Sequence, residues 1–362
     1  MRPDVILTAA RVEETAASIA AMQEPSGAIP WTIGEHTDIW NHVESAMALL
    51  VGGRVEAAGR AYDWAVSMQR ADGSWPMKIV AGEIEDHSGE TNMSAYLAVG
   101  VWHHWLIRRD EEFVRRLWTT VRRGLDWVVS MQLPFGGIAW SQEWAAGSPA
   151  KVNADALLAG SSSIYQSLRA GVALADLMDD PAAGVGAHRW PARPRAARAP
   201  RPVPGQVRVL DGLVLPGPRR SRPWRPAARE LIDSRWDTFV EAGLGIRCVS
   251  RNPWVTGAET CELVMALDAI GDRQRAVQLL ADMQHLRAEQ GKYWTGYVFP
   301  DDVNWPAEHT TYTAAAVIPA VDALTHTSAG ADIMRGTTLA ADFAEIALEC
   351  GCPSGDRVSS LS

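Results

Sequence analysis

The chain has 362 residues, 47% of them hydrophobic, and a formal net charge of −9, which suits one large or two average domains and argues against nucleic acid as a partner. The sequence has no apolar run of about eighteen residues, so we expect no membrane span. It also has no basic and apolar leader, so we expect no secretion signal. Only four cysteines, without zinc-ribbon spacing, favour a reducing compartment, so we expect a cytoplasmic protein.

One pattern recurs four times along the chain: a helical segment ends in Met-Gln, and a Gly and a Trp follow it. The glutamines of these corners are Gln23, Gln69, Gln132 and Gln284. Gly permits the left-handed turn that ends a helix. The Gln side chain can bond to backbone groups left open at the corner. After each corner, a polar loop leads into a helix that is richer in small and apolar residues.

The two kinds of helix differ in their predicted burial. Helices before the corners carry a polar face, so we expect them outside, whereas those after the corners are apolar nearly all round and should be buried on both sides. The expected pairs are 5–23 with 38–51, 56–69 with 89–106, 111–132 with 153–178, 228–242 with 257–270, and 272–288 with 307–324. We therefore predict an all-α fold, an (α/α)6 toroid made of helical hairpins. The sequence has no run of alternating β-branched residues, so we expect no sheet.

The fourth hairpin of such a toroid should lie within residues 182–227, which are instead rich in Arg and Pro. Prolines break a helix there, so the hairpin is predicted to be disrupted. The segment is either a disordered insertion or the product of a reading-frame slip in a GC-rich gene. We favour the slip, because reading one base further permits a sequence with the missing helix pair. The rest is predicted as one toroid domain over 1–325 and a tail over 326–362.

The corner from Gln69 to Trp75 reads QRADGSW and resembles the QW motif of the terpene cyclase and protein prenyltransferase superfamily. Gln23, Gln132 and Gln284 head looser copies, so the resemblance covers most of 5–324 apart from the anomalous segment. The chain is most similar to actinobacterial prenyltransferases and squalene-cyclase-like repeat proteins. The resemblance implies a transferase or cyclase that binds an isoprenoid or lipid-linked substrate in its central cavity.

The acid motifs of terpene cyclases, DxDD and DDxxD, are absent, and the nearest acid pair is Asp301-Asp302. The resemblance also implies a zinc site like that of prenyltransferase β subunits. Glu259, Cys261 and His309 stand at similar places to the Asp, Cys and His ligands of those subunits, although Glu replaces Asp. One oxygen, one sulfur and one nitrogen ligand with an open position would suit catalytic zinc. Zinc is thus the one cofactor that the resemblance implies; the alternative is that Cys261 is simply buried, that His309 caps a helix and that the chain needs no cofactor.

Carbohydrate chemistry is the alternative, because paired carboxylates can act as acid and base while Trp rings stack on sugars. The candidate catalytic acids are Asp302, Glu308, Glu259, Glu90 and Asp38, and Asp302 and Glu308 are the preferred pair because they flank Trp305. The candidate substrate-binding residues are Trp40, Glu44, Trp75, Trp140, Trp254, Trp305 and Arg251. Any single acid at a helix start can instead cap the helix. A non-catalytic toroid that binds a small ligand is the third alternative.

Overall fold

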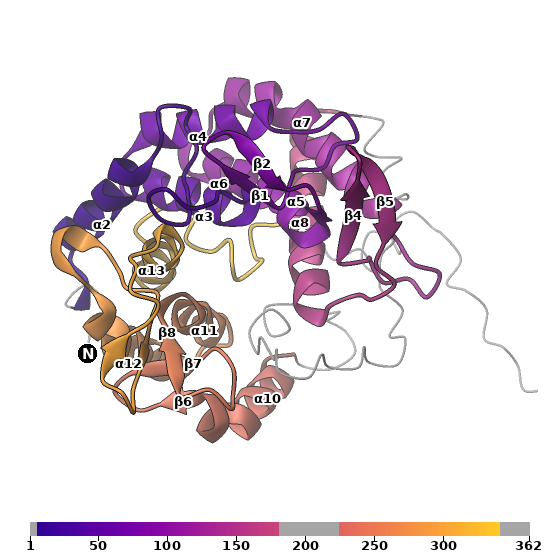
Figure 1. The fold of residues 1–362 in the computed structure, drawn as a ribbon. Coiled ribbons are helices and arrows are strands. Elements are labelled where there is room, and N and C mark those ends of the chain that lie inside the picture. The colour runs from indigo at the N-terminus through magenta and orange to yellow at the C-terminus, as the bar shows by residue number, and fades with distance from the viewer. Residues whose placement is uncertain (1–5, 181–223, 341–362) are drawn as a thin grey trace, which may run out of the picture.

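The computed structural model describes residues 6–180 and 224–340, and over these residues it forms five helix pairs arranged around a common centre (Figure 1). The outer helices are α2 (Ala9–Met22), α4 (Val55–Ser67), α7 (Glu111–Ser130), α10 (Trp224–Phe239) and α12 (Arg273–Asp282). The inner helices are α3 (Ile39–Val51), α5 (Thr91–Ala95) continued by α6 (Leu97–Arg108), α8 (Leu158–Leu177), α11 (Gly257–Ala269) and α13 (Thr311–Thr325). The predicted helical ring is confirmed.

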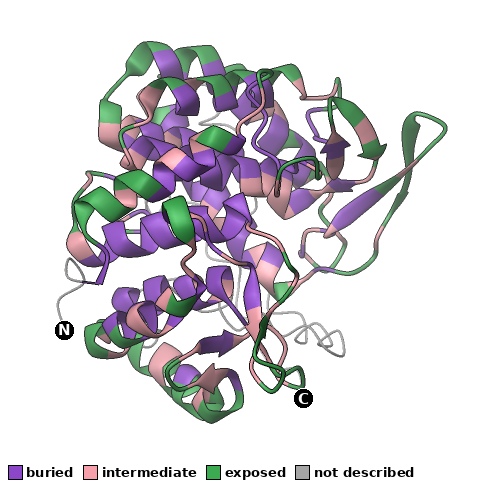
Figure 2. Cartoon of the chain, turned by 60° about the vertical axis from the view of Figure 1, so that its left-hand side comes forward, coloured by how far each residue is buried: buried purple, intermediate pink, exposed green. Residues whose placement is uncertain are grey.

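Burial separates the two layers as their sequences require. Every residue of α13 from Thr311 to Leu324 is buried, since α13 packs against α3 on one side and α11 on the other. The outer helix α7 is amphipathic, and Asp110 caps it by accepting a hydrogen bond from the Phe113 N–H at 3.0 Å. In Figure 2 the exposed residues concentrate on the outer helices and loops. Each outer helix is thus oriented by its apolar stripe, which faces inward, and its polar face, which faces solvent.

The repeated corners join each hairpin to the next outer helix. Gln69 Nε2 donates to the carbonyl of Gly73 at 2.9 Å and to that of Thr120, on α7, at 2.8 Å. Gln23 repeats this arrangement, with bonds of 3.0 Å to Gly27 and to Ala57 on α4. The two glycines have φ of +100° and +96°, and a side chain on either would collide with backbone of the neighbouring helix.

The last corner closes the ring onto the first helix. It consists of two 3₁₀ turns, Met283–Leu286 and Glu289–Gly291. Gly291 (φ +74°) lies against the backbone of α2 at Glu14 and Thr15, and Ser18 donates to the Gly291 carbonyl at 3.3 Å. The last corner therefore shares with the first two the close approach of a glycine to the neighbouring outer helix, whereas its Gln284 donates to the Leu280 carbonyl of its own helix.

The prediction that no sheet is present is wrong. The loops between outer and inner helices contain three small antiparallel sheets, with strand orders β1-β2, β3-β4-β5 and β10-β9-β8-β7-β6. The strands are β1 (Lys78–Val80), β2 (Glu83–Asp86), β3 (Gly89–Glu90), β4 (Ser141–Ala145), β5 (Ser148–Val152), β6 (Val240–Glu241), β7 (Gly245–Arg247), β8 (Trp254–Thr256), β9 (Gly296–Val298) and β10 (Val303–Asn304). None exceeds five residues, which is too short for an alternating pattern to stand out.

Residues 327–340, which we name the closing segment, pack against the second halves of the inner helices, and the yellow trace after α13 turns inward in Figure 1. Trp102 of α6 donates to the Thr338 carbonyl at 2.9 Å. Arg169 of α8 is buried and donates to the carbonyls of Gly336 and Ala340 at 3.1 and 2.8 Å. This part of the predicted tail therefore belongs to the packed ring.

Several predictions fall outside the described residues. The predicted insertion or frame slip and the disrupted fourth hairpin lie on 182–227, of which only 224–227, the start of α10, are described. The tail beyond residue 340 is likewise outside them. Over the described residues, no helix has the length and apolar character needed to cross a membrane.

Candidate active site

Glu44 and Glu262 occupy matching places on two inner helices. Each lies five residues after the first residue of its helix, on α3 and α11 respectively, and each is an acid among apolar neighbours. Glu44 is buried, with 3% of its surface exposed, and Glu262 is half-buried. Because outer helices end and inner helices begin at the same end of the ring, both carboxylates lie towards the end that carries the three sheets.

Glu262 belongs to a network that reaches two other elements. The Tyr312 hydroxyl, on the first turn of α13, donates to Glu262 Oε1 at 3.1 Å. The Tyr312 ring stacks on Trp31, with ring centroids 5.4 Å apart and planes at 29°. Trp31 Nε1 in turn donates to Glu308 Oε1 at 2.8 Å, and Thr295 donates to the same oxygen at 3.3 Å. The stacked rings of Tyr312 and Trp31 thus connect two carboxylates, those of Glu262 and Glu308.

Glu44 belongs to a second network. Trp40, one turn earlier on α3, donates from Nε1 to Glu44 Oε2 at 3.2 Å. The Trp40 ring stacks on Tyr96, with centroids 3.8 Å apart and planes at 16°. Tyr96 is fixed between α5 and α6 and is 2% exposed. The rigid pair of rings therefore orients the Glu44 carboxylate.

The buried thiol of Cys261 lies within electrostatic range of carboxylates from two inner helices. Burial raises the pKa of this thiol well above the usual range, and the negative charges of Glu44, Glu262 and Glu259 raise it further. Glu44 comes from α3 and the other two from α11. Glu44 and Glu262 therefore belong to the same region of the ring.

Asp38 and Glu90 stand at the starts of inner helices, as predicted. Asp38 caps α3 by accepting a hydrogen bond from the Asn41 N–H at 2.9 Å. Burial raises the pKa of its carboxyl, while the hydrogen bonds from Asn41 and the charge of His36 oppose this rise. Glu90 is the residue before α5, where it is half-buried and pairs with Ser141 in the sheet. For Asp38, the helix-capping alternative describes the observed contacts.

The preferred pair of the sequence, Asp302 and Glu308, is not brought together by any contact in the described residues. Asp302 lies in the exposed turn between β9 and β10 with φ +52°, and it accepts a hydrogen bond from Tyr297 at 2.6 Å. Glu308 is half-buried and belongs to the Trp31 network. The positions of the two acids on either side of Trp305 in the sequence did not show this difference, because strand β10 and a bend over residues 305–307 separate them.

The predicted tryptophans have different environments. Trp75 is 1% exposed and donates to the Ala65 carbonyl at 2.7 Å, so it is a core residue and its assignment to the substrate is wrong. Trp254 donates to the Trp305 carbonyl at 2.8 Å, and the two rings meet edge to face, 5.2 Å apart. Trp140 is half-buried beside the start of α5, and Arg251 is exposed before β8.

The predicted zinc ligands do not assemble. In residues 6–180 and 224–340, no group of three His, Cys, Asp or Glu side chains is placed to hold a metal ion. The Glu259 carboxylate instead accepts a contact from the Cys248 thiol at 3.5 Å. The ring of His309 packs against Trp294, 3.9 Å between centroids, and burial lowers its pKa. We therefore assign no role to zinc.

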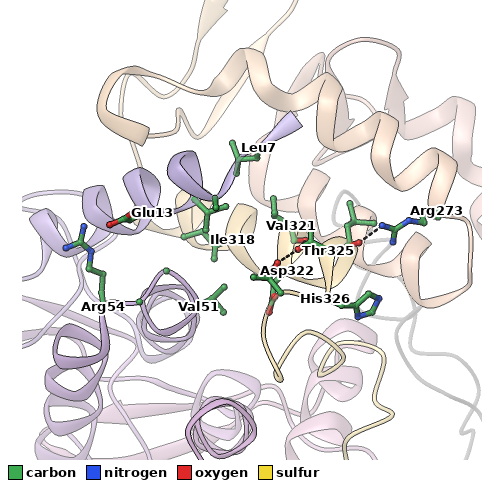
Figure 3. A pocket seen from close by; sticks show the side chains of 16 residues that line it. Leu7, Glu13, Val51, Arg54, Arg273, Ile318, Val321, Asp322, Thr325 and His326 are labelled. Carbon is green, nitrogen blue, oxygen red and sulfur yellow. Dashed lines mark hydrogen bonds between the residues drawn. The ribbon is translucent and has the colours of Figure 1, made fainter. Parts of the chain in front are cut away.

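A cavity of about 1000 Å³ lies at the other end of the ring, near the last turns of α3 and α13 and the first turns of α2 and α12 (Figure 3). Its lining is mixed, with Val51 and Ile318 beside Arg54 and Arg273. Arg273 donates to the Leu324 carbonyl, so its charge complements the C-terminal end of α13. None of the predicted site residues lines this cavity.

No protein-family model matches the chain. The chain is, however, 47% identical over 360 residues to an MMP endo-(1,4)-3-O-methyl-alpha-D-mannosidase of Mycolicibacterium hassiacum, and the match covers 97% of this chain and 96% of that protein. The chain belongs to the family of this mannosidase. It is therefore an enzyme, and the non-catalytic alternative is removed.

Several solved structures share this arrangement of helices. A glycosidase has a TM-score of 0.65 at 14% identity, over 88% of this chain and 98% of that chain. A D-mannose isomerase has a TM-score of 0.65 at 10% identity, over 88% and 97%. A cellobiose 2-epimerase from Spirochaeta thermophila has a TM-score of 0.55 at 12% identity, over 91% and 98%. These likenesses show the toroid fold.

The resemblance to terpene cyclases and prenyltransferases is wrong, since the family is that of a mannosidase. Isoprenoid and lipid-linked substrates are dropped with it. The corners explain the error: Gln69 and Gly73 fasten one hairpin to the next outer helix, so the motif reports how a helical ring is joined and carries no information on the reaction.

Sequence reasoning missed Glu262, Tyr312 and Trp31. Glu262 has a signal in the sequence, because it follows the buried Cys261 and precedes the buried Leu263 in a helix with almost no polar face. An acid in such a helix needs a partner or a function. Tyr312 and Trp31 have no comparable signal, since the contact between them joins residues that are far apart in the chain.

Proposed function

We propose that the chain is a glycoside hydrolase that cuts internal (1→4) linkages in chains of 3-O-methyl-α-D-mannose, with Glu44 and Glu262 as its paired carboxylates. The family supports the reaction, because the Mycolicibacterium hassiacum relative is named for this activity and matches almost end to end. The observation that carries the residue assignment is that each of these inner-helix carboxylates is oriented by an aromatic donor, Glu44 by Trp40 Nε1 and Glu262 by the Tyr312 hydroxyl.

Glycoside hydrolysis needs two carboxyl groups on opposite sides of the bond that breaks. One group protonates the glycosidic oxygen, so the leaving sugar departs as a neutral alcohol. The other group either removes a proton from the attacking water or attacks the sugar carbon itself. Glu44 and Glu262 suit this task because each has one oxygen fixed by a donor, Trp40 Nε1 or the Tyr312 hydroxyl.

The aromatic rings beside these glutamates suit a sugar substrate. Pyranose rings present C–H faces that stack on aromatic side chains, and the rings of Trp40 and Trp31 are both half-buried. Each is held by a second ring, Tyr96 or Tyr312, and by a hydrogen bond to a carboxylate. Walls that are fixed before the substrate arrives lower the entropy cost of binding.

The test is hydrolysis of 3-O-methylated (1→4)-α-mannose oligosaccharides by the purified chain, with product lengths read by mass spectrometry. Internal cuts are expected. Glu44→Gln and Glu262→Gln should each lower the rate by roughly 10²–10⁴ without unfolding the protein, whereas Asp302→Asn, in its exposed turn, is the matched control and should change it little.

Two results would contradict parts of this proposal. No cleavage of any methylated oligosaccharide by the unaltered chain would remove the reaction. Cleavage that survives in Glu262→Gln but is lost in Asp302→Asn would keep the reaction and move it to the pair expected from the sequence.

A further inference from the structure

Large apolar side chains are exposed in the loops at the end of the ring that carries Glu44 and Glu262. The exposed fractions are 73% for Ile33, 45% for Phe135, 63% for Leu158 and 54% for Trp305. Each residue lies between an outer helix and the inner helix that follows it, or on the first residue of that inner helix. Single exposed apolar residues need no explanation, but their gathering at one end of the ring does.

Ile33 and Trp305 lie near the Glu308 side of the site. Trp305 precedes Glu308 by three residues, and its carbonyl accepts the hydrogen bond from Trp254. Ile33 follows Trp31, whose indole holds Glu308 and whose carbonyl accepts a hydrogen bond from the Thr311 N–H at 2.9 Å. Both loops are thus tied to the start of α13.

Phe135 and Leu158 lie on the α7–α8 hairpin. The Phe135 ring lies over Gly137, which in turn lies against Ala156, two residues before Leu158. Gly160, in the same first turn of α8, lies beside Asn92 of α5. The helices α8 and α13 stand on opposite sides of the centre of the ring in Figure 1. Around the ring α3 and α6 lie between them, since α13 packs on α3, α3 on α6 and α6 on α8.

An enzyme that cuts inside a chain must hold sugars on both sides of the broken bond. In a 3-O-methyl sugar, a methyl ether stands where an unmethylated sugar has a hydroxyl. Water hydrogen-bonds the hydroxyl but not the methyl group, so an apolar side chain that covers the methyl group stabilises the complex. An unmethylated chain offers hydroxyls instead, and placing them against Leu or Ile gains nothing.

We propose that Trp305 with Ile33, and Leu158 with Phe135, form two outer subsites that receive the methyl ethers of the sugar chain on either side of the cut. This inference rests on the proposed function for the path of the chain. These four residues then select methylated over unmethylated chains, while the inner glutamates and tryptophans act on either.

The test measures affinity and leaves cleavage aside. Glu262→Gln protein is titrated calorimetrically with matched (1→4)-α-mannose oligosaccharides, with and without 3-O-methyl groups. The methylated chain should bind more tightly. Trp305→Ala and Leu158→Ala should each weaken its binding roughly three- to tenfold, as expected for one or two uncovered methyl groups, with the unmethylated chain changed less than about twofold. Leu231→Ala, an exposed leucine on the outer helix α10, is the matched control.

The outcomes separate this inference from the proposed function. Equal affinity for the two chains, or variants that weaken both equally, would overturn the outer subsites even if the unaltered enzyme cleaves. A methyl preference that Trp305→Ala and Leu158→Ala remove would establish the subsites even if cleavage fails. Absence of binding to either chain would overturn both.

Discussion

The Tyr312 hydroxyl links Glu262, which we assign to the chemistry, to helix α13. It donates to Glu262 Oε1 from the first turn of α13, and its ring rests on Trp31. A phenol at this position can orient a carboxylate without reacting itself. Tyr297 makes the corresponding bond to Asp302 in an exposed turn, so the chain contains a natural comparison.

Tyr312→Phe should lower kcat about tenfold and leave KM nearly unchanged, because one hydrogen bond to a charged group is worth about 1.5–3 kcal/mol and the ring that stacks on Trp31 is kept. Tyr297→Phe should leave both constants unchanged. Steady-state kinetics on a methylated oligosaccharide would measure the two effects. An equal loss in the two variants would show that Tyr312 does not position a reacting group.

At the residue scale, the sequence located the end of the ring but did not identify the pair. It placed Glu44 among the substrate-binding residues, and it preferred Asp302 and Glu308 as the acids because they flank Trp305. Glu262 was passed over because it stands a turn further along α11. The neighbouring helices determine which face of an inner helix points to the centre of the ring. A single sequence does not specify this rotation of the helix about its own axis.

At the element scale, the corners account for how the hairpins are joined. Gln69 satisfies two carbonyls, one of its own corner and one of the next outer helix. In the part of the chain that the structure describes, Gln132 donates to the Gly136 carbonyl of its own corner, at 3.1 Å, and is exposed. The bond within the corner is thus common to Gln69 and Gln132, and Gln69 adds a bond to the next described outer helix.

Gln69→Ala should lower the free energy of unfolding by about 1–3 kcal/mol, because it leaves the Thr120 carbonyl without its donor at a partly buried junction. Gln132→Ala should cost less than about 0.5 kcal/mol, as surface substitutions usually do. Urea unfolding followed by circular dichroism would measure both. Equal losses would mean that the bond between hairpins adds nothing.

His42 joins three elements and is fully buried. Its Nδ1 accepts from the Ile29 N–H at 3.1 Å, and its Nε2 donates to the Ala61 carbonyl of α4 at 2.8 Å. Burial lowers its pKa to about 4. The folded protein therefore keeps His42 neutral, whereas the unfolded chain protonates it below about pH 6.5.

Because the unfolded state binds this proton first, stability should fall as pH falls from about 6.5 to about 4. Burial likewise lowers the pKa of His103 to about 3 and adds to the loss. His42→Gln should be less stable at pH 7 but should lose less on acidification. Thermal midpoints across this pH range would test the sign, and an unchanged slope in the variant would contradict it.

Helix periodicity predicted all five described hairpins, since α-helices announce themselves over many residues. The strands escaped prediction because β3, β6 and β10 have two residues each and are fixed by pairing with distant loops. The pairing of Glu90 with Ser141 is one example. These sheets form the loops that surround the site, so the sequence described the frame of the ring better than its active end.

At the scale of the whole molecule, the two ends of the toroid differ. The end at which inner helices begin carries the carboxylates, aromatic rings and sheets. The other end carries the closing segment, which contacts α6, α8 and α11. The sequence predicted residues 326–340 as part of a separate tail, because they contain no helical period that would show packing.

Two buried carboxylates help to hold the closing segment: Asp322, which accepts hydrogen bonds from Ser328, and Asp268. Asp268, at the end of α11, is 3% exposed and accepts from Arg335 Nε at 2.8 Å, with Arg273 at 3.6 Å on its other oxygen. Removing Asp268 would leave Arg335 and Arg273, whose side chains are 26% and 49% exposed, so water would compensate much of their charge and the cost stays below the roughly 3–5 kcal/mol of a fully buried pair. The pair Glu111–Arg115 on α7 has both partners more than half exposed.

Asp268→Ala should therefore lower the free energy of unfolding by about 1–3 kcal/mol, as for lost hydrogen bonds to a charged group, whereas Glu111→Ala should cost less than about 0.5 kcal/mol. Adding Arg335→Ala to Asp268→Ala should cost little more than either change alone, because both remove the same contact. Hydrolysis per folded molecule should stay constant, since the closing segment lies at the far end from Glu44 and Glu262. Additive losses in this cycle would show that the segment is held elsewhere, and a parallel loss of activity would show that the two ends of the ring are coupled.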